Sequence, residues 1–298
     1  MPKGKLFIGT SGWVYGHWEG VFYPEDLPSK DKLKYFSRHF KTAEINYSFY
    51  HLPRPSTYQN WYNQTPADFI FSVKASRFIT HIKRLKGVKE AWKTFIENAL
   101  NLKEKLGPIL FQFPPSFRVT EENIKSLIEF LKLLSLDRSR ASISLRFAFE
   151  FRHKSWCDQK VYKLLKKYNA AWVIADSPRY PRADEVTADF VYIRMHGSKV
   201  MFSSNYTKKE LSSLSQKIKK YLRQGLDVYV YFNNDAYGYA IENAKELLKI
   251  CGPRKKYERL LEGQKVTEKD VLRWTKEARL LKKAGKLPKL KSWVAFEK

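Results

Sequence analysis

The feature that most constrains this chain is a regular alternation between short apolar runs and longer amphipathic stretches. The amphipathic stretches, such as 88–105, repeat apolar residues every three or four positions, which is typical of a helix with one buried face. Strand and helix alternating eight times predict a single (β/α)8 barrel of the TIM type, with a doubly wound open sheet as the alternative. The eight runs, rich in β-branched and aromatic residues, are 6–12, 42–49, 69–75, 108–114, 142–152, 171–177, 190–197 and 227–234.

The predicted helices indicate the C-terminal boundary of the barrel domain. Further helices are expected near 30–39, 121–134, 158–168, 207–223 and 236–250. The stretch 178–188 contains two prolines and has room for no more than a short turn. We therefore expect a barrel domain over 1–252. A basic helical C-terminal extension is expected over 253–298, where 15 Lys and Arg against 6 Asp and Glu give a net charge of +9.

The charge of the whole chain points to an anionic partner. The 298 residues contain 56 Lys and Arg but only 30 Asp and Glu, a net charge of +26. A surface this basic attracts polyanions, and nucleic acid is the most abundant of these in a cell. A thermophile-like, lysine-rich surface is the alternative, although ion-pair networks would require more acidic residues. The extension could grip a phosphate backbone, or it could pack on the barrel with a solvated lysine face.

Several classes of protein are disfavoured by what the sequence lacks. Cys157 and Cys251 are far apart and form no C-x-x-C pair, which argues against a disulfide framework or a structural zinc site. Apolar runs long enough for a signal peptide or a membrane span are missing, so we expect a cytoplasmic protein without membrane contact. No phosphate loop, dinucleotide-binding glycine motif or serine-hydrolase elbow occurs, so no nucleotide cofactor is expected.

Polar side chains stand near the end of every predicted strand. In a TIM barrel the functional site is built at the C-terminal ends of the strands, so these residues are expected to meet at one mouth. Arg194 and His196, two positions apart, should point to the same side of their strand. Charged groups buried there must satisfy one another or hold a ligand. The residues expected to bind substrate are Ser11, Asn46, Tyr50, Lys74, Gln112, Arg152, Trp156, Arg194, Asn233 and Asn234.

Four of the strand-end residues are the candidates for catalysis. Glu44, Glu150, Asp176 and His196 could exchange protons or ligate a divalent metal, Mg, Mn or Zn, since carboxylate and imidazole groups suit these ions. No closely spaced pair of histidines supports a metal site. The alternative is a structural ion network in which the carboxylates pair with neighbouring arginines.

The motifs as a set resemble those of a known family. In order, they are GTSGW at 9–13, EINYSFY at 44–50, FIFSVKA at 69–75, LFQFPPSF at 110–117, FEFRHKSW at 149–156, YIRMHG at 192–197 and YVYFNN at 229–234. This series is similar to that of the YecE-like proteins, domain of unknown function 72. The resemblance covers roughly residues 5–250 and implies a TIM barrel, but it implies no reaction. Its recurrent polar positions coincide with the strand-end residues.

Three functions follow as expectations. The first is a nuclease that cleaves phosphodiesters at the mouth, with Lys74, Arg152 and Arg194 as phosphate clamps and Tyr50 and Trp156 stacking bases. The second is a metal-free hydrolase or isomerase acting on a small anionic substrate, with Glu150 as the base. The third is a nucleic-acid-binding module whose mouth is only structural.

Overall fold

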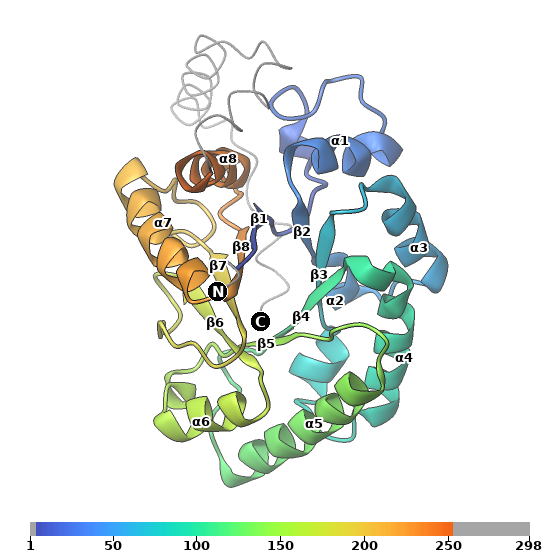
Figure 1. The fold of residues 1–298 in the computed structure, drawn as a ribbon, viewed down its shortest axis with the longest axis vertical. Coiled ribbons are helices and arrows are strands. Elements are labelled where there is room, and N and C mark those ends of the chain that lie inside the picture. The colour runs from blue at the N-terminus through green and yellow to red at the C-terminus, as the bar shows by residue number, and fades with distance from the viewer. Residues whose placement is uncertain (1–3, 253–298) are drawn as a thin grey trace. The chain divides into compact units, whose positions relative to one another are not determined.

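The eight predicted strands form one parallel sheet that curls into a barrel. A computed structural model describes residues 4–252 of the chain. Within that range the strands neighbour one another in the order β1-β8-β7-β6-β5-β4-β3-β2. Helices surround the sheet (Figure 1), so the fold is a TIM-like (β/α)8 barrel as predicted. The strands are β1 (Leu6–Thr10), β2 (Thr42–Ile45), β3 (Ile70–Lys74), β4 (Leu106–Gln112), β5 (Phe147–Glu150), β6 (Ala171–Asp176), β7 (Phe190–Met195) and β8 (Asp227–Phe232).

The helices follow the predicted segments closely. Two begin with side-chain caps that the sequence indicates: Thr120 accepts from the Asn123 N–H at 3.1 Å, and Thr207 forms a capping box with Glu210. The main helices are α1 (Lys32–His39), α2 (Tyr47–Tyr50), α3 (Pro55–Gln64), α4 (Lys89–Ala99), α5 (Glu121–Arg140), α6 (Gln159–Lys167), α7 (Lys208–Arg223) and α8 (Tyr239–Cys251). The sequence prediction missed α2 and α3.

Two other expectations have clear outcomes. The chain passes from β6 to β7 without an intervening helix, as the prolines in 178–188 predicted. The predicted extension over 253–298 lies outside the described residues. Among residues 4–252, no helix combines the length and apolar character needed to cross a bilayer.

The barrel closes between β1 and β2, where the strands make only a local bridge. Ser11 and Glu44 form a parallel bridge, and the Gly12 N–H donates to Glu44 O at 2.8 Å. Gly9 makes this approach possible, because a Cβ atom at that position would lie 2.1 Å from Thr42 O. The absence of a Cβ atom at Gly9 therefore allows β1 to pack against β2 and places Ser11 beside Glu44.

The inside of the barrel is unusually polar just below the strand ends. Tyr192 and Tyr231 point inward with the small residues Ala148 and Ala171. Their hydroxyls bond across the barrel, Tyr231 with Thr42 at 2.7 Å and Tyr192 with Ser72 at 2.6 Å. This layer forms a hydrogen-bonded floor beneath the C-terminal ends of the strands, whereas the larger apolar core fills the space between strands and helices.

Candidate active site

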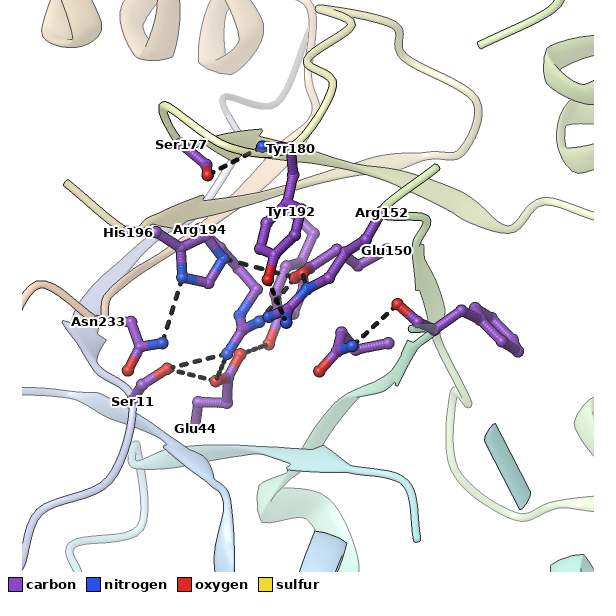
Figure 2. A network of polar contacts seen from close by, with 12 residues as sticks. Ser11, Glu44, Glu150, Arg152, Ser177, Tyr180, Tyr192, Arg194, His196 and Asn233 are labelled. Carbon is purple, nitrogen blue, oxygen red and sulfur yellow. Dashed lines mark hydrogen bonds and ion pairs between the residues drawn. The ribbon is translucent and has the colours of Figure 1, made fainter. Parts of the chain in front are cut away.

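A buried ion network occupies the mouth of the barrel, which is the region enclosed by the C-terminal ends of the strands. Glu44 on β2, Glu150 on β5 and Arg194 on β7 point inward and are each at most 1% exposed. Arg194 lies between the two carboxylates (Figure 2). Its Nη2 donates to Glu44 Oε1 at 2.7 Å, and its Nη1 donates to Glu150 Oε2 at 2.6 Å.

Neighbouring groups complete this arrangement, which we call the Arg194 network. The hydroxyl of Ser11 donates to Glu44, and the Tyr192 hydroxyl donates to Glu44 Oε2 at 2.7 Å. Arg152 Nε donates to Glu150 Oε1 at 2.9 Å. The network therefore consists of Ser11, Glu44, Glu150, Arg152, Tyr192 and Arg194.

Both carboxylates of the network are ionised at neutral pH. Burial by itself raises the pKa of Glu150, but the guanidinium groups of Arg194 and Arg152 hold that pKa well below its usual range. Burial likewise opposes ionisation of Glu44, and Arg194 together with the hydroxyls of Ser11 and Tyr192 lowers its pKa. A carboxylate held in this way is a weak base and cannot act as a proton donor.

His196 is neutral and completely buried. Its Nδ1 bonds the Asn233 amide at 3.2 Å, and its Nε2 lies 3.7 Å from Glu150 Oε2, beyond hydrogen-bond reach. Burial and the charge of Arg194 lower the pKa of His196 to about 4. The imidazole therefore borders the Arg194 network without adding to its charge at neutral pH.

Lys74, the last residue of β3, differs from the arginines and glutamates of the site because its charged group has no described partner. The residue is 8% exposed, and its Nζ lies 4.0 Å from the centroid of the Phe49 ring. Over residues 4–252, no group accepts a hydrogen bond or forms an ion pair with this amine. Burial, together with the charges of Arg194 and Arg152, lowers the pKa of Lys74 to about 7. A lysine in this state exchanges protons close to neutral pH.

Lys105 shows how a buried lysine is normally accommodated in this protein. It is 3% exposed, and its Nζ donates to Tyr62 O at 2.6 Å and to Thr65 O at 2.7 Å. The two lysines have similar burial, but only Lys105 has acceptors for its ammonium protons. The difference makes Lys74 a candidate functional residue.

Most of the remaining predicted residues surround the mouth. Gln112 lies level with Glu150 on the neighbouring strand, and its amide donates to Phe113 O at 2.9 Å. Asn46 precedes α2, and its Oδ1 is buried without a hydrogen-bond partner among the described residues. Tyr50, at the end of the same helix, is 54% exposed.

Asp176, Trp156 and Asn234 do not join this group. Asp176 pairs in register with Met195, so its side chain faces outward, where it bonds Tyr206 and Arg182 and lines a separate cavity of about 230 Å³. Trp156 is fully buried and stacks on Phe151 at 4.4 Å, and its indole N–H donates to Phe117 O. Asn234 donates to Asn243 Oδ1 at 2.8 Å.

The predicted metal ligands are therefore divided. Glu44, Glu150 and His196 meet at the mouth, whereas Asp176 lies on the outer side of β6. Within the described part of the chain, no three His, Cys, Asp or Glu side chains are placed to hold a metal ion together. One oxygen of each of these glutamates accepts from Arg194, and the other accepts from Tyr192 or Arg152, so a cation would have to displace these donors to reach them.

Sequence reasoning passed over Tyr192 and Phe49, which both contribute to the site. Tyr192 could have been found, because it lies two residues before Arg194 and so shares its inward face. Phe49 carried no such signal. Its contact with Lys74 depends on the short helix α2, which the sequence did not indicate.

Comparison with known proteins places this chain in a wider group. The chain matches the family described as "Protein of unknown function DUF72" over residues 7–268. The UPF0759 protein YunF of Bacillus subtilis is 27% identical over 277 residues, which cover 82% of this chain and 94% of YunF. The UPF0759 protein YecE of Escherichia coli is 27% identical over 129 residues, which cover 43% of this chain and 44% of YecE.

Two crystal structures share the fold. A DUF72 family protein of Thermotoga maritima superposes with a TM-score of 0.69 at 30% identity, covering 87% of this chain and 99% of its own. A DUF72 family protein of Enterococcus faecalis superposes with a TM-score of 0.70 at 22% identity, covering 83% and 95%.

Proposed function

This chain belongs to the DUF72 family, and we propose that it is an enzyme that acts on a small anionic substrate at the mouth of its barrel without a metal. The family name specifies no reaction, so the proposal rests on the site. The single observation that carries it is Lys74, a buried residue whose amine has no acceptor among the described residues. An anion entering the mouth would supply the missing partner.

The charges at the mouth support the binding of an anion. Glu44 and Glu150 are balanced by Arg194 and Arg152, so they leave no net negative charge to repel an anion. Lys74 is poised to gain a proton as the anion binds, because a nearby negative charge favours the ammonium form. At the end of a reaction step the same proton could be donated to the product.

The state of Glu150 argues for Lys74 as the proton-transfer group. The sequence favoured Glu150 as the base, but two guanidinium groups keep its pKa well below the usual range. A general base works best when its pKa lies near the operating pH. The pKa of Lys74, lowered to about 7, meets this condition.

Calorimetry with a simple anion tests the proposal. Phosphate and pyruvate would be titrated into the protein at pH 8, in buffers of different ionisation enthalpy. We expect binding accompanied by uptake of close to one proton, because Lys74 is mostly neutral at that pH. Lys74→Met should abolish the uptake and weaken binding at least about tenfold, which corresponds to about 1.4 kcal/mol.

A matched control separates this effect from a change in overall charge. Lys41 is an exposed lysine paired with Asp68 at 3.0 Å, and Lys41→Met should bind both anions as the native protein does. The proposal fails if neither anion binds at millimolar concentration, or if Lys74→Met binds with the same affinity and proton uptake.

A nuclease is the second candidate, and the net charge of +26 favours it. Here Lys74 would hold a phosphate, and the exposed Tyr50 would stack a base at the rim. We expect cleavage of single- or double-stranded DNA or RNA with Mg²⁺, Mn²⁺ or Zn²⁺ present. Glu150→Gln should abolish cleavage but keep binding, whereas the surface change Glu129→Gln should leave both intact.

The same assay separates the nuclease from a binding module. Binding that falls steeply with the logarithm of salt concentration, without cleavage under any of these conditions, would identify a nucleic-acid-binding protein that does not cut. Absence of both binding and cleavage would remove nucleic acid as a partner of the described barrel and its extension alike.

A further inference from the structure

Lys74 differs from an ordinary anion-binding lysine in its surroundings. An anion clamp gains most from a group that is always charged and forms several hydrogen bonds, which describes arginine. The mouth already contains two arginines, yet the residue at the end of β3 is a lysine whose amine lies against an aromatic ring. Burial and the charges of those two arginines oppose protonation of Lys74, so the lone pair of its amine is available for bond formation near neutral pH.

Hydrogen bonds hold the backbone from which the Lys74 side chain extends. The buried hydroxyl of Ser48 donates to Lys74 O at 2.6 Å, and the Ala75 N–H donates to Leu110 O at 2.8 Å. The Phe49 ring lies on one side of Nζ, at 4.0 Å from its centroid. A substrate can therefore approach the nitrogen only from the other sides, which gives a nucleophile a defined direction of attack.

From this geometry we propose that the substrate is an anionic carbonyl compound, such as a 2-oxo acid, and that Lys74 captures it as a Schiff base. The inference rests on the proposed function and names the substrate class of the same site. The carboxylate or phosphate of the substrate supplies the negative charge, and its carbonyl carbon supplies the electrophile.

The chemistry of capture balances without a redox partner. The lone pair of the neutral Lys74 amine forms a C–N bond to the carbonyl carbon, and the π electrons of the C=O bond move to the oxygen. The resulting carbinolamine loses its oxygen as water, with both hydrogens of that water coming from the original amine. Protonation of the imine nitrogen gives an iminium ion, and water reverses the sequence to release the carbonyl compound.

Two features of the site act in favour of the iminium charge. A positive nitrogen at the position of Lys74 Nζ lies over the face of Phe49, where the ring quadrupole attracts cations. The ionised Glu44 and Glu150 act on the same position through space, since both raise the pKa of Lys74 against the opposing effect of burial. These contributions offset part of the cost that burial and the charges of Arg194 and Arg152 impose on a cation at this position.

Borohydride trapping in the native protein tests the inference. The protein would be incubated at pH 7 with pyruvate, or with dihydroxyacetone phosphate, and then treated with sodium borohydride, which reduces the imine to a stable secondary amine. Peptide mapping should show that Lys74 is labelled about tenfold faster than the exposed Lys41 or than Lys105, whose ammonium group is fully hydrogen-bonded. The rate of labelling should rise with pH with a midpoint near 7.

Variants test whether a lost label reflects the missing Lys74 amine or an unfolded protein. Lys74→Met and Lys74→Arg should both remove the fast label, whereas Lys41→Met should keep it, with circular dichroism confirming that each variant is folded. Label spread equally over surface lysines overturns the inference. If phosphate binding depends on Lys74 but neither carbonyl compound labels it, the proposed function stands and the Schiff base is wrong. If phosphate and pyruvate also fail to bind, both proposals fall.

Discussion

Arg194 and Glu150 form an ion pair of 2.6 Å in which both side chains are only 1% exposed. The same guanidinium also holds Glu44, so one arginine neutralises carboxylates from two strands, β2 and β5, that are not neighbours in the barrel. Ion pairs at this depth are costly to build, because both charges must leave water. Their main effect here is on chemistry, because they keep the acids ionised and unreactive. Burial, together with the charges of Arg194 and Arg152, lowers the pKa of Lys74, the nearby amine that has no described acceptor.

Removing Arg194 should destabilise the protein strongly. Arg194→Met leaves two carboxylates buried without their main partner, and we expect the free energy of unfolding to fall by about 3–5 kcal/mol in urea at pH 7. Because Glu44 and Glu150 have lowered pKa values in the native protein, their contribution is present above the usual carboxyl pKa and is lost only as pH falls through the lower folded values. The difference between variant and native protein should therefore persist from pH 7 down to about pH 4 and shrink only below that pH.

A second arginine provides the control for this prediction. Arg146 bonds Asp227 at 2.7 Å at the opposite end of the barrel, and its side chain is 23% exposed. Arg146→Met should cost about 1 kcal/mol, because its partner is partly solvated. An equal loss of unfolding free energy in the two variants would contradict the view that the buried Arg194 network contributes more to stability than the Arg146 pair.

Replacing Lys74 should stabilise the protein. In the folded state its pKa is lowered to about 7, whereas an unfolded lysine keeps its ordinary value near 10.4. Below pH 7 both states carry the proton and the folded protein bears the full cost of the buried charge. We expect Lys74→Met to raise the free energy of unfolding by about 3 kcal/mol at pH 6.

The advantage of Lys74→Met should decline as the pH rises. Between pH 7 and about 10 the folded protein gives up the proton that the unfolded chain retains, so native stability rises relative to the variant. Urea unfolding of both proteins at pH 6 and pH 9.5 measures this change. A pH-independent difference would mean that the Lys74 amine is not perturbed in the folded state.

Ser48 should act as a positioning residue for Lys74. Ser48→Ala removes the hydrogen bond to Lys74 O, and we expect a loss of about 1 kcal/mol in stability. The more telling readout is amine labelling, in which the rate at Lys74 should fall several-fold and its pH midpoint should move. Ser37 is also buried but bonds Lys34 O within α1, and Ser37→Ala should leave the labelling of Lys74 unchanged.

Gly9 should be required for closure of the barrel. A methyl group there would meet Thr42 O at 2.1 Å, so Gly9→Ala must push β1 away from β2 and is expected to cost about 3 kcal/mol. A methyl group at Gly16 would meet no atom within 4 Å, and Gly16→Ala should change stability by less than about 0.5 kcal/mol. Thermal unfolding of the two variants side by side measures the contrast, and a tolerated Gly9→Ala would contradict this account of closure.

The barrel and the location of its mouth could be predicted from the sequence alone. Apolar periodicity reports which face of each segment is buried, and eight alternations of strand and helix leave few ways to bury those faces. Parallel strands also bring their C-terminal ends to one side, so polar residues such as Glu44, Glu150 and Arg194 were expected to gather there.

Only the tertiary structure decided which of these residues face one another. Asp176 and Arg194 both stand near strand ends, but the pairing of Asp176 with Met195 turns the first outward while Arg194 points in. That difference depends on the register between strands, where a shift of one residue reverses every side chain. Trp156 lies beyond the end of β5, where strand alternation no longer fixes direction, and packing draws it into the aromatic core.

The tertiary structure likewise decided which buried lysine has hydrogen-bond partners. The sequence contains many lysines, and nothing in its pattern separates Lys74 from Lys105. The fold gives Lys105 two carbonyl acceptors and gives Lys74 an aromatic ring with two guanidinium charges nearby. The pKa of a side chain depends on burial and on the charges around it, and these come from residues far apart in the chain, so the chemistry of Lys74 appears only when the barrel closes.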